Sequence, residues 1–155
     1  MAKYTMFRSD NLAGTHLGSK LVSLRMSEDL ENGSIVLIGA LEAGEREVKT
    51  CTAPTAGATI GQLAILGSEE VVKNVKYDTV GDFINLKDSV ARGYVLTKND
   101  VFAVTAKAFT AAPEVGAEIG VAAGSHKMVT GGEIKIGKCI AIEPDGATTW
   151  YVVEV

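Results

Sequence analysis

The chain has 155 residues, a length that fits one domain large enough to bury a hydrophobic core without disulfides or metals. Its formal net charge is −4, from 15 basic and 19 acidic residues, and it has no long basic run. This argues against nucleic acid and anionic membrane surfaces as partners, because both are recognised through clustered lysine and arginine.

Other compositional signals point to a soluble protein made in a reducing cytoplasm. No apolar run approaches the roughly 20 residues that span a bilayer, and the N-terminus lacks the hydrophobic segment of a secretory signal. The only cysteines, Cys51 and Cys139, lie in separate strand-like segments and form no C-x-x-C pair. Neither has the local signature of a catalytic nucleophile.

The 17 glycines, few aromatics and abundant valine, isoleucine and threonine are typical of an all-β protein with many turns. We expect about eight to ten short strands in a single compact β-barrel or β-sandwich-like domain over residues 19–155. Residues 68–75 are the best helix candidate, with Ser68 as a possible cap.

Residues 1–18 are predicted to form an extended N-terminal arm. The arm carries large apolar side chains at Tyr4, Met6 and Phe7, within an otherwise polar and glycine-containing stretch. A terminal segment of this kind is disordered unless something ties it down. These side chains predict that something does.

The next segments predict hairpins. Asn32 and Gly33 lie between two apolar runs, 21–30 and 35–41, and Asn-Gly is a strong hairpin signal because both residues accept a positive φ. A turn at 41–45 leads to a strand over 46–52, and a loop over 53–61 precedes a short strand over 62–66.

The middle of the chain is harder to interpret. Residues 76–92 carry Phe83, Ile84 and Leu86, which must pack on a short helix or an irregular loop. A strand, a turn at 97–100 and a strand over 101–105 follow. Residues 106–125 are rich in small residues and contain one expected strand segment at Ile119 and Val121.

Near the C-terminus, Gly132, Gly137 and Lys138 have the G-x-x-x-x-G-K spacing of a phosphate-binding loop. That motif needs a helix after the lysine and a hydroxyl ligand for Mg²⁺, yet the next residue is Cys139. The surrounding residues alternate polar and apolar until the turn residues 144–147. The pattern predicts a hairpin with strands at 133–143 and 148–155, and no nucleotide site.

No catalytic, cofactor or metal site is predicted, and we do not expect an enzyme. His16 and His126 have no H-x-H or H-x-x-x-H partner, and there is no G-x-S-x-G elbow. The acidic clusters at 28–31 and 42–47 flank predicted turns, where solvated charge is usual. A concave pocket that gathered His16 or His126 with carboxylates would favour an enzyme.

Three stretches, MFRSDNLAGTHLGSK, SEDLENGSIVLIGALEAGEREV and VARGYVLTKNDVFAVTAKAF, resemble small proteins of tailed bacteriophages and prophages that are encoded beside the major capsid protein. These are capsid-associated or head-decoration proteins. The resemblance covers residues 1–110, and beyond them only the glycine-rich, β-rich style is similar.

The resemblance implies a structural virion protein, made in the bacterial host cytoplasm, that binds the major capsid protein on the outer capsid surface as a homotrimer and stabilises the shell. By analogy, the N-terminal arm contacts the shell, with candidate binding residues Lys3, Tyr4, Met6, Phe7 and Arg8. It implies no cofactor, nucleic acid or membrane partner.

Three alternatives remain open. One is a β-sandwich module that binds carbohydrate or a cell-surface ligand through an aromatic platform, and another is a tail-tube or head–tail joining protein that assembles into rings. An enzyme is the third. Of Trp150 and Tyr151, which lie on opposite faces of the last predicted strand, one is expected to face the core and the other to remain free for a partner.

Overall fold

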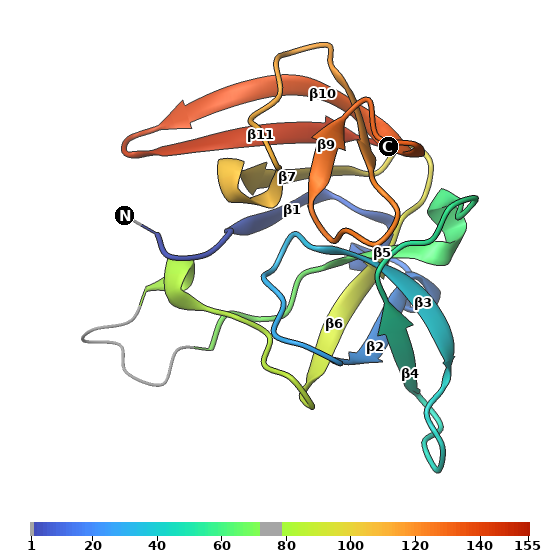
Figure 1. Cartoon of the computed structure of the whole chain (residues 1–155). Coiled ribbons are helices and arrows are strands. Elements are labelled where there is room, and N and C mark those ends of the chain that lie inside the picture. Colours follow the sequence, from blue (N-terminus) through green and yellow to red (C-terminus); the bar gives the residue numbers. More distant parts are fainter. Residues whose placement is uncertain (1, 72–78) are drawn as a thin grey trace.

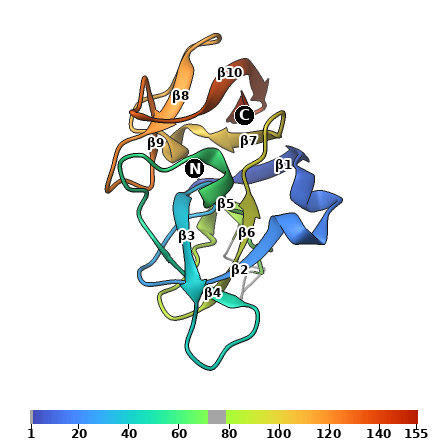
Figure 2. The same ribbon diagram turned by 90° about the vertical axis from the view of Figure 1, so that its right-hand side faces the viewer.

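The computed structural model describes residues 2–71 and 79–155 and confirms the prediction of an all-β fold. The strands form a closed barrel and a six-stranded sheet, which lie one above the other (Figures 1 and 2). Five single-turn 3₁₀ helices connect strands in the described residues: η1 (Ala13–Thr15), η2 (Gly18–Lys20), η3 (Ile60–Gln62), η4 (Val80–Asp82) and η5 (Ala106–Ala108). No helix in the described part of the chain is both long and apolar enough to cross a membrane.

The barrel contains five strands in the closed order β2-β4-β3-β5-β6. All its pairs are antiparallel except β2 with β4, which are parallel. Closure gives every barrel strand two neighbours, so none of them is an edge strand. The strands are β2 (Leu21–Arg25), β3 (Ile35–Leu41), β4 (Val48–Thr52), β5 (Leu63–Leu66) and β6 (Val90–Val95).

The six-stranded sheet is open and antiparallel throughout, in the order β1-β7-β11-β10-β8-β9. Its longest strands form the C-terminal hairpin, whose tip projects beyond the rest of the sheet (Figure 1). The strands are β1 (Phe7–Asn11), β7 (Val101–Thr105), β8 (Glu118–Val121), β9 (Met128–Thr130), β10 (Ile134–Asp145) and β11 (Thr148–Glu154).

Two clusters of buried apolar side chains hold the molecule together. The smaller one draws only on barrel strands and their connections, and includes Leu24, Met26 and Val36. The larger one joins side chains of the barrel, such as Ile65 and Leu96, to side chains of the sheet, such as Phe102. The barrel and the sheet therefore share a core, and the sheet covers one side of the barrel.

Asp100 organises the crossing from the barrel to the sheet, between β6 and β7. Its side chain is buried, and its carboxylate accepts hydrogen bonds from the backbone N–H groups of Ala13, at 2.9 Å, and Thr97, at 2.8 Å. The backbone of Val155 bonds to Asn99 and Asp100, which ties the C-terminus to the same turn. The predicted turn at 97–100 is present, but its two strands belong to different sheets.

The hairpin predicted around Asn32 and Gly33 is wrong. β2 ends at Arg25 and pairs with β4 and β6, and β3 pairs with β4 and β5. The Asn32 side chain is buried, where its amide oxygen accepts from Ser68 N–H and its amide nitrogen donates to the Ser68 carbonyl. Asn-Gly therefore builds a buried connection, with Gly33 at a φ of +82°, instead of a two-residue turn.

The N-terminal segment is extended over β1, turns at η1 and η2, and is tied to this chain's own sheet. Residues 7–11 form β1 and pair with β7, while Thr5 and Leu12 are buried. A terminal segment without such contacts is poorly ordered, whereas here backbone pairing and burial hold it in place.

The C-terminal hairpin is confirmed. Ile134 and Ile136 are both buried on one face of β10, as the alternating pattern predicts. The stretch after Lys138 continues as strand, so the chain lacks the strand-to-helix turn that a phosphate-binding loop requires. Of the helix predicted over 68–75, residues 68–71 are not helical, and the remainder lies outside the described residues.

Candidate interaction surface

Hydrogen bonds fix the backbone of residues 3–6 between the barrel connections and β7. Tyr4 N–H donates to the Gly81 carbonyl at 2.7 Å, and Met6 N–H donates to the Thr105 hydroxyl at 3.1 Å. The Glu31 carboxylate accepts from both the N–H and the hydroxyl of Thr5, at 2.8 and 2.6 Å. The alternation along this extended segment then turns Tyr4 and Met6 away from the buried Thr5.

A groove of about 730 Å³ lies between this segment, the end of β7 and the start of β11. In Figure 1 the segment that leads into β1 lies below the tip of the β10–β11 hairpin, and residues of both line the groove. Its lining comes from four distant parts of the sequence: Ala2, Tyr4, Met6, Thr79, Asp82, Thr105, Ala106, Lys107, Ala147, Thr148, Thr149 and Tyr151.

The groove combines apolar walls with a polar rim. Tyr4, Met6 and Tyr151 supply large, partly exposed apolar surfaces. Lys107 donates from Nζ to the Lys3 carbonyl at 2.7 Å, and the Lys3 ammonium lies 5.0 Å from the centre of the Tyr4 ring. Such a site can bury the side chains of an extended segment while its rim hydrogen-bonds to the backbone.

Asp82 contributes a negative charge on the other side of the groove. Its carboxylate accepts hydrogen bonds from the N–H and hydroxyl of Thr79, at 2.8 and 3.0 Å. The backbone hydrogen bond from Thr79 lowers the pKa of Asp82, with the Thr79 hydroxyl as the second cause. Asp82 therefore stays ionised to a lower pH than an ordinary aspartate.

The structure separates the five candidate binding residues. Tyr4 and Met6 line the groove, and Lys3 lies beside Tyr4. Phe7 instead packs against the larger buried cluster, with its ring centre 5.8 Å from that of Tyr94. Phe7 is partly buried and contributes to this packing.

Arg8 belongs to β1 and does not line the groove. Its side chain contacts the β10–β11 hairpin. Its guanidinium lies 5.2 Å from the centre of the Trp150 ring and donates to Glu143 at 2.7 Å and to Asp10 at 2.9 Å. The hydrogen bonds to Asp10, and then those to Glu143, raise the pKa of Arg8. The only tryptophan is thus stacked against an arginine, which leaves it less open as a flat platform for a sugar ring.

Tyr151 faces the other way from Trp150, as predicted for neighbours on one strand. Its ring packs edge-on against Phe109 with centres 5.7 Å apart, and it also forms part of the groove wall. Sequence reasoning did not connect Tyr151, Thr105 or Lys107 with the N-terminal segment, because about 100 residues or more separate them from Tyr4.

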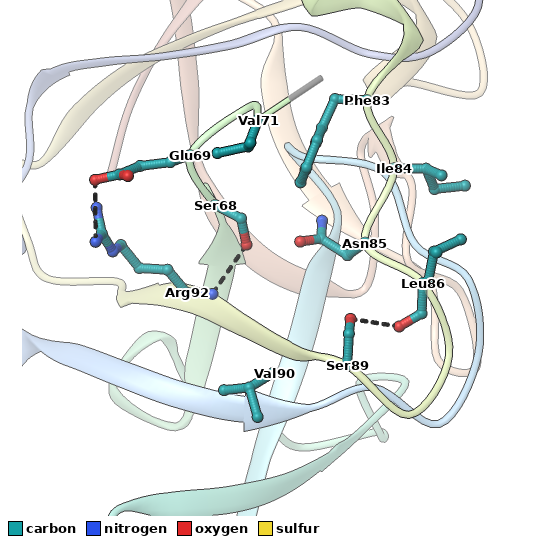
Figure 3. A pocket seen from close by; sticks show the side chains of 10 residues that line it. All are labelled: Ser68, Glu69, Val71, Phe83, Ile84, Asn85, Leu86, Ser89, Val90 and Arg92. Atoms are coloured by element: carbon teal, nitrogen blue, oxygen red, sulfur yellow. Dashed lines mark hydrogen bonds and ion pairs between the residues drawn. The ribbon is translucent and has the colours of Figure 1, made fainter. Parts of the chain in front are cut away.

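A second hollow, of about 440 Å³, lies beside β6 (Figure 3). Phe83, Leu86 and Val90 give it apolar character. Its charged residues are already paired, since Arg92 lies 3.4 Å from Glu69, and the Ser68 hydroxyl accepts from Arg92 N–H at 3.0 Å. Among the described residues that line this hollow, these pairings leave no set of free polar groups that converge on one point.

A third hollow, of about 370 Å³, brings His126 together with Asp29 and Glu31, while His16 is not part of it. This is the combination that would favour an enzyme, but its polar groups make structural bonds. Asp29 accepts from Lys87 N–H at 2.7 Å, and Glu31 accepts from Thr5. Among the described residues no group of three or more His, Cys, Asp or Glu side chains is placed to hold a metal ion.

Both cysteines are buried and free of disulfides. Desolvation raises the pKa of the Cys51 thiol, with the charge of Glu28 as a second cause, and desolvation also raises the pKa of the Cys139 thiol. A thiol that stays protonated is a poor nucleophile. The two side chains act as small core residues.

Comparison with known proteins identifies no relative. No family model, curated protein or solved structure matches this chain.

Proposed function

We propose that this protein is a structural virion component that binds the outer surface of a phage capsid and stabilises the shell. The proposal rests on the sequence resemblance described above. The structural observation in its favour is the groove, in which Tyr4 and Met6 of the N-terminal segment meet Tyr151 of the last strand. Apolar and aromatic side chains around a concavity are the usual anchors of protein–protein contacts.

In this proposal the groove contacts the major capsid protein, and three copies associate around a three-fold position of the shell. Each copy contributes a modest contact, and association of the copies raises the occupancy through avidity. No cofactor, nucleic acid or membrane takes part, and no catalytic role is proposed.

Two alternatives differ in what they require of this surface. A carbohydrate-binding module needs an accessible aromatic platform, whereas Arg8 stacks against Trp150. A tail-tube or head–tail joining protein would assemble into rings, which sedimentation and electron microscopy distinguish from trimers.

The test measures the ratio of this protein to the major shell protein in washed particles from the native source. The Tyr4→Ala/Met6→Ala double variant should reduce this ratio about tenfold or more, because two anchor side chains are lost while Phe7 and the fold are kept. Circular dichroism and thermal unfolding verify that the variant is folded.

The matched control is Leu17→Ala, because Leu17 is 55% exposed and lies outside the groove. It should leave the ratio unchanged. Unchanged occupancy of the folded double variant would contradict the role of the groove. Absence of the wild-type protein from washed particles would end the capsid proposal altogether.

A further inference from the structure

His126 joins the sheet to the barrel. It lies in the connection between β8 and β9, and its carbonyl accepts a hydrogen bond from Ile35 N–H, at the start of barrel strand β3, at 2.9 Å. The same connection donates Gly124 N–H to the carbonyl of Pro54 at 2.8 Å. The side chain of His126 is only 15% exposed, so it is held within this junction.

Both ring nitrogens of His126 face oxygen atoms of the barrel region. Nδ1 lies 2.9 Å from the carbonyl oxygen of Ile35, and Nε2 lies 3.1 Å from a carboxylate oxygen of Glu28. A carbonyl oxygen and an ionised carboxylate can only accept hydrogen bonds. A neutral imidazole carries one N–H, so it can satisfy one of these oxygens, whereas an imidazolium satisfies both.

We propose that His126 is a proton-dependent clasp, in which the imidazolium binds Ile35 and Glu28 at once and fastens the 122–127 connection to the barrel. Loss of the proton leaves an imidazole lone pair facing either the carbonyl or the carboxylate. One of the two contacts then becomes repulsive, and the connection is released more often.

The neighbouring charges leave Glu28 as the direct partner of the ring. Asp29, Glu31, Lys107 and Lys127 line the adjoining hollow. Asp29 accepts from Lys87 N–H, Glu31 from Thr5, and Lys107 donates to the Lys3 carbonyl. Lys127 follows His126 in the chain, and its positive charge disfavours a second positive charge on the ring. The charge of Glu28 also raises the pKa of Cys51, which is a buried thiol.

The sign of the pH effect follows from the proton count. The clasp contributes its full stabilisation while the imidazole is protonated and Glu28 is ionised. The contribution is lost when rising pH removes the proton from the ring.

Hydrogen exchange at the Gly124 and Ile35 amides tests the clasp in the intact chain. Their protection factors, corrected for intrinsic exchange, should fall about two- to fivefold between about pH 5.5 and 7.5, the range expected for one partly exposed ion pair. The Leu96 amide, which bonds to Leu63 inside the barrel, serves as the reference for global stability. Nitrogen shifts of the His126 ring should report an imidazolium at the lower pH.

Two variants separate the clasp from a general pH effect. In Glu28→Gln the amide can accept from or donate to Nε2, so the connection should stay closed and its pH dependence should disappear. The matched control His16→Gln removes the exposed histidine and should keep the wild-type pH dependence.

A flat pH response at Gly124 and Ile35 in the wild type would overturn the proposal. So would an unchanged response in Glu28→Gln, or a neutral His126 ring at the lower pH. None of these outcomes bears on capsid binding, so the clasp and the proposed function are tested separately.

Discussion

The barrel and the six-stranded sheet differ in their strand edges: the barrel has none and the sheet has two. Every barrel strand has two hydrogen-bonded neighbours, whereas the sheet ends at β1 and β9. Within the sheet, the outer side of β10 pairs with β8 only as far as Lys138, and the rest of β10 pairs with β11 alone. The candidate groove is formed mostly by the N-terminal segment, β7 and β11, at the open part of the fold.

The difference shows that one β protein can combine a region without edge strands and a region with them. The closed barrel has no edge strand, so it serves as a scaffold. An open sheet leaves concave space where its strands end at different points. The free stretch of β10 includes Pro144, which lacks an N–H and is typical of edge strands that do not recruit another strand. The groove is therefore the surface that we propose for a partner, in preference to this edge.

The largest expected effect tests whether the two regions form one cooperative unit. Phe102→Ala removes a fully buried ring from the cluster shared by the barrel and the sheet, and should cost about 3 to 5 kcal/mol of unfolding free energy. Leu24→Ala, inside the barrel cluster, should cost about 2 to 5 kcal/mol. Urea unfolding followed by circular dichroism measures both.

Fluorescence of Trp150, the only tryptophan, reports on the sheet in the same experiment. Because the larger cluster contains side chains from both regions, fluorescence and circular dichroism should give coincident transitions in each variant. Leu41→Ala, at an exposed position on the barrel, should leave the midpoint nearly unchanged. Separate transitions in Phe102→Ala would mean that the barrel folds independently of the sheet.

A smaller loss is expected at the crossing between the two regions. Asp100→Ala leaves the N–H groups of Ala13 and Thr97 without their acceptor, and should lower the unfolding free energy by about 2 to 4 kcal/mol. Asp100→Asn keeps one acceptor oxygen, so its unfolding free energy should lie between those of the wild type and Asp100→Ala. Asp145→Ala, an exposed aspartate at the hairpin tip, is the matched control; if Asp100→Ala lost no more than this control, Asp100 would not organise the crossing.

The smallest expected effect concerns the outer face of the sheet. Arg8→Lys keeps the charge but cannot bind Asp10 and Glu143 through a planar fork while stacking on Trp150. The unfolding free energy should fall by about 0.5 to 1 kcal/mol, and Trp150 emission should shift to the red as the indole becomes more exposed. The control Arg46→Lys, in the exposed connection between β3 and β4, should change neither the unfolding free energy nor the Trp150 emission. An unchanged emission in Arg8→Lys would show that the stacking is not maintained in solution.

Part of the candidate surface was predictable. Tyr4 and Met6 are large apolar residues in a polar segment, and that contrast marked them as candidates for contact. The same contrast also selected Phe7, which is partly buried and packs against the larger cluster. Its contact with Tyr94 of barrel strand β6 could not be predicted, because Tyr94 lies far from Phe7 along the chain.

The sequence by itself determined the all-β class, most strand positions and the turn at 97–100, because side-chain alternation and turn residues act over a few neighbouring residues. The turn expected at 144–147 is shorter and lies at residues 146–147, since β10 continues to Asp145. The tertiary structure decided which strands pair. Asn32 and Gly33 allow a tight turn, yet barrel closure gives β2 the partners β4 and β6, and the buried Asn32 bonds to Ser68. Pairing, the groove and the His126 junction depend on contacts between distant residues, which local patterns do not specify.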